Sequence, residues 1–195
     1  MSPAERSAVR LCLVRHASVD VRPEQPGPQW HLSAQGRAEA EALAADPFWQ
    51  DLRVLFTSPE PKAVGTAQRI AAPHGLPIGI APDLREVEGR AWAGPDAYQE
   101  QVQRYLRGEA IDSWEPKDRA QRRVRACIDG ILADDGSSRV AVVSHGLILT
   151  LYLADLLKLE GAAAYELWSA IRFPDVAVVD PAAGAVVQRF GERPG

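Results

Sequence analysis

The segment at residues 9–17, VRLCLVRHA, constrains the fold of this chain more than any other. Its first residues are mostly apolar and suit a β-strand, and the run then stops at the charged pair Arg15–His16. A short apolar run that ends in charge is typical of a buried strand whose carboxyl end is exposed, and ligands of open α/β sheets bind beyond such ends. The segment therefore predicts a core strand that presents His16 to a binding crevice, with Arg15 as a fixed positive charge. Such a pair on its own is more often an ordinary polar strand end.

The same pattern recurs later in the chain and predicts an α/β fold. A short apolar run at residues 53–57 is typical of a buried strand, and residues 76–81 predict a third strand that Pro77 and Gly79 weaken. The run at residues 139–146 again stops at a histidine, His145. Two β-rich runs at residues 175–179 and 185–190 predict an antiparallel hairpin at a sheet edge. Helices are predicted from the N-cap Ser33 to Pro47, from the N-cap Ser58 through Ala71, and at residues 99–106, 118–134, 147–159 and 165–171.

Length and composition favour one globular domain. The chain has 195 residues, of which 46% are hydrophobic and 25% are charged, and this suits a single domain over residues 1–195 with one sizeable core. Between about residues 82 and 115 the pattern loosens, and this stretch is interpreted as a lid-like excursion from the core. Cys12 and Cys127 lie in apolar segments without the spacing of a metal or redox motif, so both are expected to be reduced.

The charge balance limits the classes of partner. A net charge of −4 leaves no basic excess for phosphate backbones, which argues against nucleic acid or an acidic membrane as a partner. It does not exclude a local positive pocket. The N-terminal residues MSPAERSA have mixed charge, and the apolar run that follows is too short for a signal or membrane segment. A cytoplasmic protein is therefore expected, and its oligomeric state is left open.

Charged and nucleophilic groups follow three of the predicted strands, where they could bind a phosphoryl group. His16 and His145 end two apolar runs, and Lys62 comes shortly after a third, in the first turn of a predicted helix. The helix dipole disfavours a cation there, so Lys62 either serves a ligand or simply reaches into solvent. Gly146 allows a tight turn into the helix after His145, whose first amide groups would form an anion site.

Such an arrangement can transfer a phosphoryl group. Fixed donors stabilise the charge that develops on the phosphoryl oxygens, and a nucleophile such as His16 can accept the group and pass it to water. A carboxylic acid has to protonate the leaving oxygen. Glu86 and Glu88, both within the excursion, are candidates for that acid.

Four motifs occur in a fixed order along the chain. Their residues are Arg15–His16 followed by Ala17; Thr57–Ser58, Lys62–Ala63 and Thr66–Ala67; Leu84–Arg85–Glu86 with Gly89; and Val142–Val143–Ser144–His145–Gly146. In this order the chain resembles the histidine phosphatase superfamily, branch 1, which is phosphoglycerate mutase-like and also includes small phosphatases. Leu32–Ser33 with Gly36 resembles the start of the family's first helix. The resemblance covers residues 9–157.

The resemblance implies a fold, a mechanism and a set of site residues. The fold is a three-layer α/β/α sandwich with a mostly parallel central sheet. The mechanism uses no metal ion and no cofactor, and it proceeds through a phosphohistidine on His16, with Glu86 rather than Glu88 as the acid. The expected catalytic residues are His16, Glu86 and His145, and the expected phosphate-binding residues are Arg15, Lys62, His145 and Gly146.

Three positions depart from the family pattern. Lys62 replaces an arginine, and a point charge cannot hold two phosphoryl oxygens as a planar guanidinium does. Ala17 replaces a glycine and is expected to add a methyl group to the pocket. Arg22 stands roughly where many members have an asparagine that contacts phosphate.

The predicted function is that of a metal-independent phosphomonoesterase acting on a small phosphorylated metabolite. A phosphoglycerate-mutase-like phosphotransferase is the nearest alternative, although the excursion is short for enclosing a bisphosphorylated intermediate. A non-catalytic phosphate-binding protein would need neither His16 nor Glu86. A metal site at His16 and His145 would lack a carboxylate at ligand spacing.

Aromatic residues in the segments expected to flank the pocket bear on the substrate. An aromatic or sugar-bearing leaving group and simple packing of the excursion explain them equally well. These residues are Trp30, Trp92, Tyr98 and Trp114.

Overall fold

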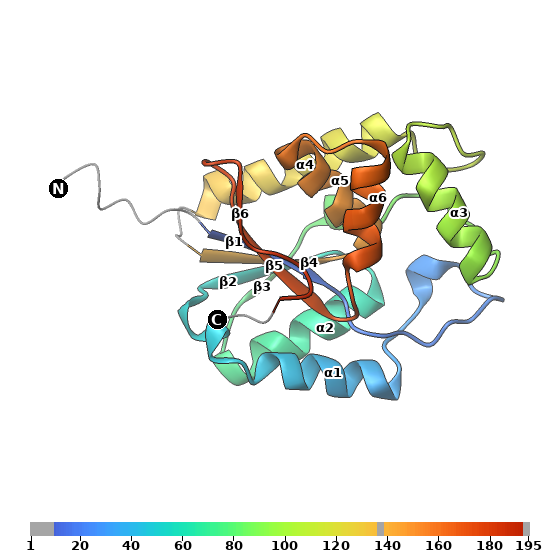
Figure 1. Ribbon diagram of the computed structural model, residues 1–195. Coiled ribbons are helices and arrows are strands. Elements are labelled where there is room, and N and C mark those ends of the chain that lie inside the picture. Colours follow the sequence, from blue (N-terminus) through green and yellow to red (C-terminus); the bar gives the residue numbers. More distant parts are fainter. Residues whose placement is uncertain (1–9, 136–138, 193–195) are drawn as a thin grey trace.

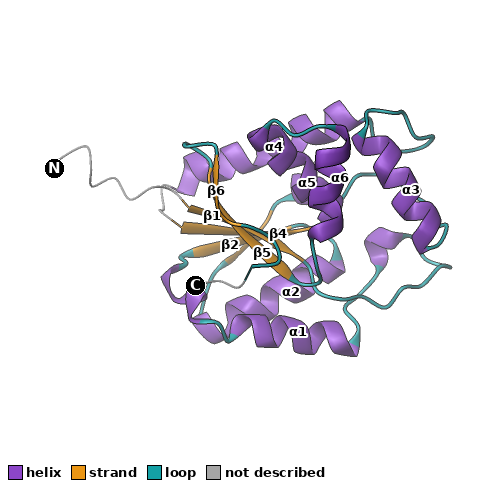
Figure 2. Ribbon diagram, viewed as in Figure 1, coloured by secondary structure: helices purple, strands orange, loops and turns teal. Residues whose placement is uncertain are grey.

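The computed structural model describes residues 10–135 and 139–192, so Val9 and the segment MSPAERSA lie outside the described residues. In that part of the chain, six strands form one sheet and helices cover both of its faces (Figure 1 and Figure 2). The strands are β1 (Arg10–Arg15), β2 (Val54–Thr57), β3 (Ile78–Ile80), β4 (Arg139–Ser144), β5 (Asp175–Asp180) and β6 (Ala185–Gln188). The main helices are α1 (Ala34–Ala44), α2 (Pro61–Ala71), α3 (Pro95–Leu106), α4 (Lys117–Asp135), α5 (Gly146–Leu157) and α6 (Gly161–Ala170).

The strands follow the order β3-β2-β4-β1-β5-β6. Neighbours among β1, β2, β3 and β4 pair in parallel, and β5 runs antiparallel to β1. β5 and β6 form the predicted antiparallel hairpin, which places β6 at an edge of the sheet. The predicted α/β/α sandwich with a mostly parallel sheet is therefore confirmed.

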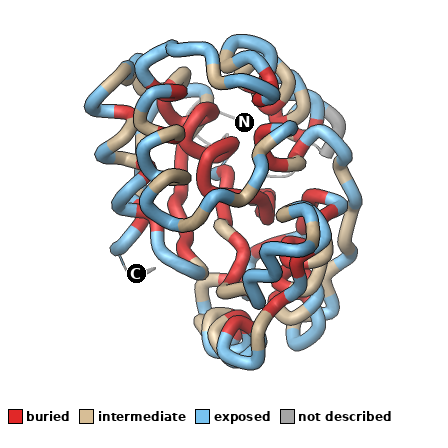
Figure 3. The backbone as a smooth tube through the Cα atoms, turned by 90° about the vertical axis from the view of Figure 1, so that its right-hand side faces the viewer, coloured by how far each residue is buried: buried red, intermediate tan, exposed pale blue. Residues whose placement is uncertain are grey.

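Two apolar cores, one on each face of the sheet, follow from the alternation of side chains along the strands. In β1, Leu11 and Leu13 belong to the core formed with α4 and α5, whereas Cys12 and Val14 belong to the core formed with α1 and α2. All four side chains are fully buried, and Figure 3 shows buried segments inside a more exposed outer layer. Strands buried on both faces have continuous apolar sequences, which is why the sequence pattern located them.

The excursion at residues 82–115 carries α3, which packs against α6 (Figure 1). Its two ends lie together, because the Glu115 amide donates a hydrogen bond to the Glu88 carbonyl oxygen at 3.0 Å. Gly89 is required at this junction. It has a φ of +78°, and a Cβ atom there would lie 1.6 Å from the carbonyl oxygen of Ser113.

Three helices begin at positions other than those predicted. α2 begins at Pro61 with Glu60 as N-cap, not directly after Ser58, because a proline at the first helical position has no N–H to leave unpaired. α3 begins at Pro95 and α6 at Gly161, each about one turn before the predicted start. In both α2 and α3, a proline occupies the first helical position.

Cys12 and Cys127 are both free thiols, as expected. Burial raises the pKa of Cys12 to about 12, so this thiol is an apolar core group. No helix among residues 10–135 and 139–192 is long and apolar enough to span a membrane.

Candidate active site

The carboxyl ends of three neighbouring strands meet at one cavity. The His16 amide donates to the Ser144 carbonyl oxygen at 3.0 Å, and the Ser58 amide donates to the Val143 carbonyl oxygen at 3.0 Å. These bonds tie together the segments that follow β1, β2 and β4. The cavity beside them has a volume of about 580 Å³. Every residue predicted to form the site lines it: Arg15, His16, Lys62, Glu86, His145 and Gly146.

His16 is buried in the cavity wall with a defined ring orientation. Its Nδ1 atom lies 2.8 Å from the Ala17 carbonyl oxygen. Because a carbonyl oxygen can only accept, Nδ1 carries the hydrogen, and Nε2 of the neutral ring is unprotonated. Burial lowers the pKa of His16 well below its ordinary value of 6.5, and His145, Lys62 and Arg15 add to the shift. At neutral pH the ring is therefore uncharged, and the lone pair on Nε2 gives it the chemistry of a nucleophile.

Arg15 lies beside His16 and is held by two contacts. Its Nη1 atom donates to the Ile171 carbonyl oxygen at 2.6 Å, and its guanidinium carbon lies 3.4 Å from the ring centroid of Phe173. Burial lowers the pKa of Arg15 to about 10, so the group stays positively charged at neutral pH. A Cβ atom at Gly146 would lie 3.1 Å from the guanidinium group, so glycine there leaves room for the arginine.

His145 meets His16 edge-on, with 5.1 Å between the ring centroids. Its Nε2 atom lies 2.8 Å from Ser58 Oγ and 3.3 Å from Glu60 Oε1. Its Nδ1 atom is buried and has no hydrogen-bond partner within the part of the chain that the structure describes. Burial lowers the pKa of His145 well below 6.5, and the charge of Lys62 adds to the shift. The ring is therefore neutral, with one nitrogen satisfied and the other left without a partner.

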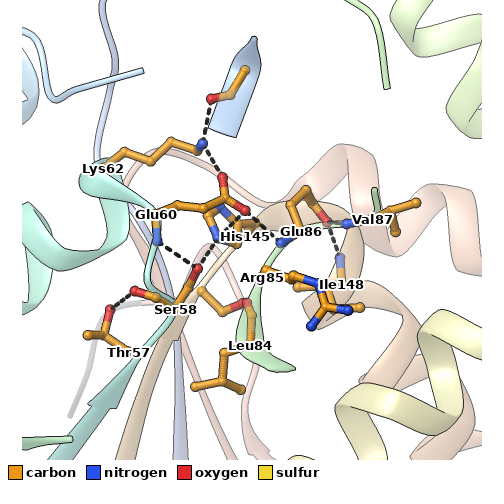
Figure 4. A network of polar contacts seen from close by, with 12 residues as sticks. Thr57, Ser58, Glu60, Lys62, Leu84, Arg85, Glu86, Val87, His145 and Ile148 are labelled. Atoms are coloured by element: carbon orange, nitrogen blue, oxygen red, sulfur yellow. Dashed lines mark hydrogen bonds and ion pairs between the residues drawn. The ribbon is translucent and has the colours of Figure 1, made fainter. Parts of the chain in front are cut away.

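Glu60, which the sequence analysis did not select, connects this histidine to Lys62 (Figure 4). Its Oε2 atom accepts from Lys62 Nζ at 2.5 Å, and its Oε1 atom accepts from the Glu86 amide at 2.8 Å. Lys62 also donates to the Gly27 carbonyl oxygen at 2.8 Å. Burial lowers the pKa of Lys62, and the Glu60 carboxylate opposes that shift. The sequence signal for this pair was the position of Glu60, two residues before Lys62. The helix dipole disfavours a cation in the first turn, so Lys62 needs a nearby carboxylate.

Glu86 is buried and is fixed by backbone amides around the start of α5 (Figure 4). Its carboxylate accepts from the amides of Leu147 at 3.1 Å, Ile148 at 2.8 Å and Val87 at 3.0 Å. The sequence predicts that the first amides of this helix form an anion site for phosphate. For Leu147 and Ile148 that prediction is wrong, because the excursion brings the Glu86 carboxylate to the helix N-terminus, where it occupies the anion site itself.

Glu88, the other candidate acid, lies outside the cavity. It is exposed, and its Oε1 atom accepts from Arg85 Nε at 2.5 Å. The two carboxyl groups that the sequence could not separate by direction alone are therefore separated by the structure, which brings Glu86 and not Glu88 to the cavity.

Two departures from the family pattern have consequences other than those expected. Ala17 is fully buried and packs with Leu32 and Ala40, so its methyl group extends a small apolar cluster and does not enter the cavity. Arg22 is exposed and is not among the residues that line the cavity. Its carbonyl oxygen accepts from Trp30 Nε1 at 2.9 Å, so the residue supports the loop and not the ligand site.

Arg90 is a further cation at the cavity that the sequence analysis missed. Its Nε atom donates to the Val87 carbonyl oxygen at 2.7 Å, and its Nη1 atom donates to the Tyr98 hydroxyl at 2.6 Å. After burial and Lys62, its positive charge is the next cause of the lowered pKa of His145. Its place in the excursion, shortly after Glu86, was the only sequence signal available.

Three of the four aromatic residues considered from the sequence line the cavity, namely Trp30, Trp92 and Tyr98. Trp114 does not line it and packs against Tyr105, with 5.2 Å between the ring centroids. Three further aromatic residues line the cavity and carried no sequence signal, because they lie beyond the last motif: Tyr165, Trp168 and Phe173.

The site as a whole combines two neutral histidines with cations and carboxylates at the ends of parallel strands. Among the described residues, no group of three His, Cys, Asp or Glu side chains is arranged to hold a metal ion. In open α/β sheets, small ligands bind in a crevice beyond the carboxyl ends of the strands, and this cavity has that position. The model of the histidine phosphatase superfamily (branch 1) matches residues 11–172. The chain belongs to this superfamily.

Two relatives have sequences similar to this chain. The "Uncharacterized protein Rv0525" of Mycobacterium tuberculosis is 34% identical over 141 residues, which cover 65% of this chain and 67% of the relative. The "Probable phosphoglycerate mutase GpmB" of Yersinia enterocolitica is 29% identical over 166 residues, which cover 77% of this chain and 76% of the relative.

Solved structures show the same fold. Bacillus stearothermophilus YhfR matches with a TM-score of 0.77 and 20% identity, covering 95% of this chain and 98% of that chain. The mycobacterial glucosyl-3-phosphoglycerate phosphatase Rv2419c, in its structure with VO3, matches with a TM-score of 0.70 and 25% identity, covering 88% of this chain and 92% of that chain.

Proposed function

We propose that this chain is a phosphomonoesterase that works without a metal ion and through a phosphohistidine on His16. The observation that carries the proposal is a pair of buried, unpartnered nitrogen atoms among the described residues, Arg15 Nε and His145 Nδ1, on two side chains that line the same cavity as His16. Buried polar atoms are rarely left without a hydrogen bond. A phosphoryl group between them would accept from Arg15, and its negative charge would favour a protonated His145 whose Nδ1–H also donates.

In the first step, Nε2 of neutral His16 attacks the phosphorus atom, and the bond from phosphorus to the leaving oxygen breaks. Arg15, Lys62 and Arg90 supply fixed positive charge for the phosphoryl oxygens. Glu86, in its protonated form, gives its proton to the leaving oxygen and becomes a carboxylate, so that an alcohol departs. The Oε2 atom of Glu86 accepts a backbone hydrogen bond at 3.1 Å and has a second lone pair that can carry this proton.

In the second step, a water molecule attacks the phosphohistidine and gives a proton to the Glu86 carboxylate. The bond from phosphorus to His16 breaks, and inorganic phosphate leaves. Glu60 acts through its neighbours: it holds the Lys62 ammonium group and can accept from Nε2–H of a protonated His145. Glu60 is thus a positioning residue in this mechanism.

The names of the relatives support the proposal and also favour one second candidate. Rv2419c is named as a phosphatase, and VO3 in its structure resembles a phosphoryl group in transfer. GpmB is named as a probable phosphoglycerate mutase, which favours a phosphotransferase as the second candidate. The two candidates share the first step and differ in whether water or an alcohol accepts the phosphoryl group.

Steady-state hydrolysis of p-nitrophenyl phosphate in the presence of EDTA tests the proposal. The wild-type protein should keep its full rate, and His16→Asn should lose at least about 10³-fold. His31→Asn is the matched control, because His31 is an exposed histidine outside the cavity. Loss of wild-type activity with EDTA, or an active His16→Asn variant, would contradict the mechanism. Isomerisation of phosphoglycerate faster than its hydrolysis would favour the phosphotransferase.

A further inference from the structure

The part of the cavity wall that does not come from the strand ends is formed largely by aromatic rings. Ring centroids lie 5.4 Å apart for Trp30 and Trp92, 5.9 Å for Trp92 and Tyr98, 5.9 Å for Tyr98 and Trp168, and 5.6 Å for Trp168 and Tyr165. These separations are typical of rings in contact. The five rings therefore form one continuous surface, which we call the aromatic wall.

The aromatic wall is assembled from segments that are distant in sequence. Trp30 lies in the loop after β1, Trp92 and Tyr98 in the excursion, and Tyr165 and Trp168 on α6. Figure 1 shows α3 and α6 side by side on one flank of the molecule. Two polar atoms of the wall already have partners, since Trp30 Nε1 donates to Arg22 and the Tyr98 hydroxyl accepts from Arg90. The faces of the five rings offer a ligand apolar surface.

The acidic, basic and histidine side chains that line the cavity are those of the proposed phosphoryl site, which we call the phosphate end: Arg15, His16, Lys62, Glu86, Arg90 and His145. Of these, Arg90 also contacts the wall through Tyr98. The remaining lining residues carry no formal charge. The Arg90 guanidinium is already bonded to the Val87 carbonyl oxygen and the Tyr98 hydroxyl. An anionic group placed against the aromatic wall would lose its hydration without gaining a dedicated cation.

Exposed apolar side chains add apolar surface to the cavity beyond the wall. Val21 is 47% exposed and Phe173 is 42% exposed, and both line the cavity. A ligand with apolar surface would cover part of them. The cavity volume of about 580 Å³ falls in the range of sites for small organic ligands, so it can hold a ring-sized group in addition to a phosphoryl group.

We propose that the leaving group of the substrate is an uncharged, ring-bearing alcohol whose apolar face lies against the aromatic wall. The proposal rests on the proposed phosphomonoesterase function and names the substrate class for that site. The phosphoryl group occupies the phosphate end, and the ring replaces water on the aromatic surface. Phosphomonoesters with a carboxylate in the leaving group are poor substrates, because the wall offers that carboxylate no dedicated cation.

Three phosphomonoesters separate ring binding from charge: benzyl phosphate, para-carboxybenzyl phosphate and ethyl phosphate. All three release alkoxides that need a proton, so differences in kcat/KM report on contacts with the leaving group. Benzyl phosphate should exceed both of the others by about tenfold or more, since ring contacts and the desolvation of a carboxylate each have effects of this size. Equal values for the three esters would overturn the proposal.

Variants locate the effect on the wall. Trp92→Ala should lower the ratio of kcat/KM for benzyl phosphate to that for ethyl phosphate about tenfold. Val21→Ala, at the cavity, should weaken benzyl phosphate about twofold to threefold. Val187→Ala is its matched control, because Val187 is 53% exposed and lies outside the cavity, and it should change neither ester. An unchanged preference in Trp92→Ala would place the ring elsewhere and overturn the proposal.

Binding without turnover distinguishes failure of this inference from failure of the proposed function. Benzylphosphonate and para-carboxybenzylphosphonate cannot be hydrolysed, and calorimetry with the wild-type protein measures their affinities directly. If benzylphosphonate binds more tightly than para-carboxybenzylphosphonate, the leaving-group site is supported. This holds even if no phosphomonoester is hydrolysed, a result that would contradict the phosphatase function alone. Hydrolysis without any preference in rate or affinity would support the function and overturn the leaving-group site.

Discussion

The two ends of the cavity are built differently, and the difference separates chemistry from selectivity. The phosphate end comes from the ends of sheet strands and from residues held against them, and His145 and Lys62 there are 1% and 5% exposed. The aromatic wall comes from loops and from α3 and α6, and three of its five rings, those of Trp92, Tyr98 and Tyr165, are only half-buried. Groups on rigid elements keep a precise geometry, whereas exposed segments tolerate change. We therefore expect changes at the phosphate end to affect all substrates and changes at the wall to affect only some.

Glu86→Gln should give the largest loss of rate. Although Glu86 lies at the phosphate end, we expect its replacement to affect the two esters unequally. Benzyl phosphate hydrolysis should slow about 10³-fold, because its alkoxide needs a proton from this residue. Hydrolysis of p-nitrophenyl phosphate should slow far less, because p-nitrophenolate leaves without a proton. Single-turnover rates of both esters make the comparison, and exposed Glu88 serves as the control through Glu88→Gln, which should slow neither ester. Equal losses in Glu86→Gln would mean that Glu86 positions the phosphoryl group and that the acid lies elsewhere.

Lys62→Ala should lower kcat/KM about 10²-fold, the usual effect of losing one preorganised donor. The factor should be the same for p-nitrophenyl phosphate and benzyl phosphate, because Lys62 acts on the phosphoryl oxygens. Lys62→Arg should keep measurable activity, since its guanidinium supplies the charge. The alanine variant also leaves the buried Glu60 carboxylate without its cation, so it should lose about 3 kcal/mol of unfolding free energy. Wild-type rates in Lys62→Ala would show that the lysine is structural only.

Glu60→Gln should lower kcat/KM about tenfold for both esters, because the ammonium group of Lys62 loses the charged hydrogen bond that holds it. A double-mutant cycle separates this role from a general loss of structure. In the Lys62→Ala background, Glu60→Gln should have a clearly smaller effect, since the group it positions is gone. Fully additive losses would show that Glu60 does not act through Lys62.

The smallest expected effect is on stability at acid pH, and it belongs to the phosphate end. His16 and His145 have lowered pKa values in the folded chain, so below pH 6.5 the unfolded chain binds more protons than the folded one. Unfolding free energy should therefore fall as the pH drops below 6.5, by up to about 1.4 kcal/mol per histidine and pH unit. Urea unfolding from neutral to mildly acid pH measures this slope. The slope should be shallower in His16→Asn, and an unchanged slope would mean that His16 is not a buried neutral ring.

What the sequence predicted well was local. A strand buried on both faces needs a continuous apolar run, and the groups after β1 and β4 follow directly in the chain, so His16 and His145 could be placed at the same crevice in advance. Glu86 needed the family resemblance to be chosen over Glu88, because residues two apart in an extended segment share a face. The structure then separated them.

What the sequence did not predict depends on contacts across long stretches of chain. Glu86 reaches the amides of Leu147 and Ile148 from about sixty residues away, and no local pattern shows that a helix N-terminus is already occupied. The aromatic wall needs α6 to pack on α3, so Tyr165 and Trp168 could not be linked to the site from their own neighbourhood. Ser58 was assigned as a helix cap on sound local grounds, yet the next proline moved the helix start and left its hydroxyl for His145.

The central claim is that one phosphoryl-His16 intermediate serves every substrate, while the aromatic wall acts only until the leaving group has departed. Rapid-quench measurement with radiolabelled benzyl phosphate and p-nitrophenyl phosphate, in EDTA, tests it most directly. The account predicts acid-labile, base-stable label on His16 from both esters. It also predicts that the label forms at different rates but is lost with the same rate constant, because the leaving group is absent from the second step. No label on His16, or a loss rate that depends on the ester used, would contradict the account.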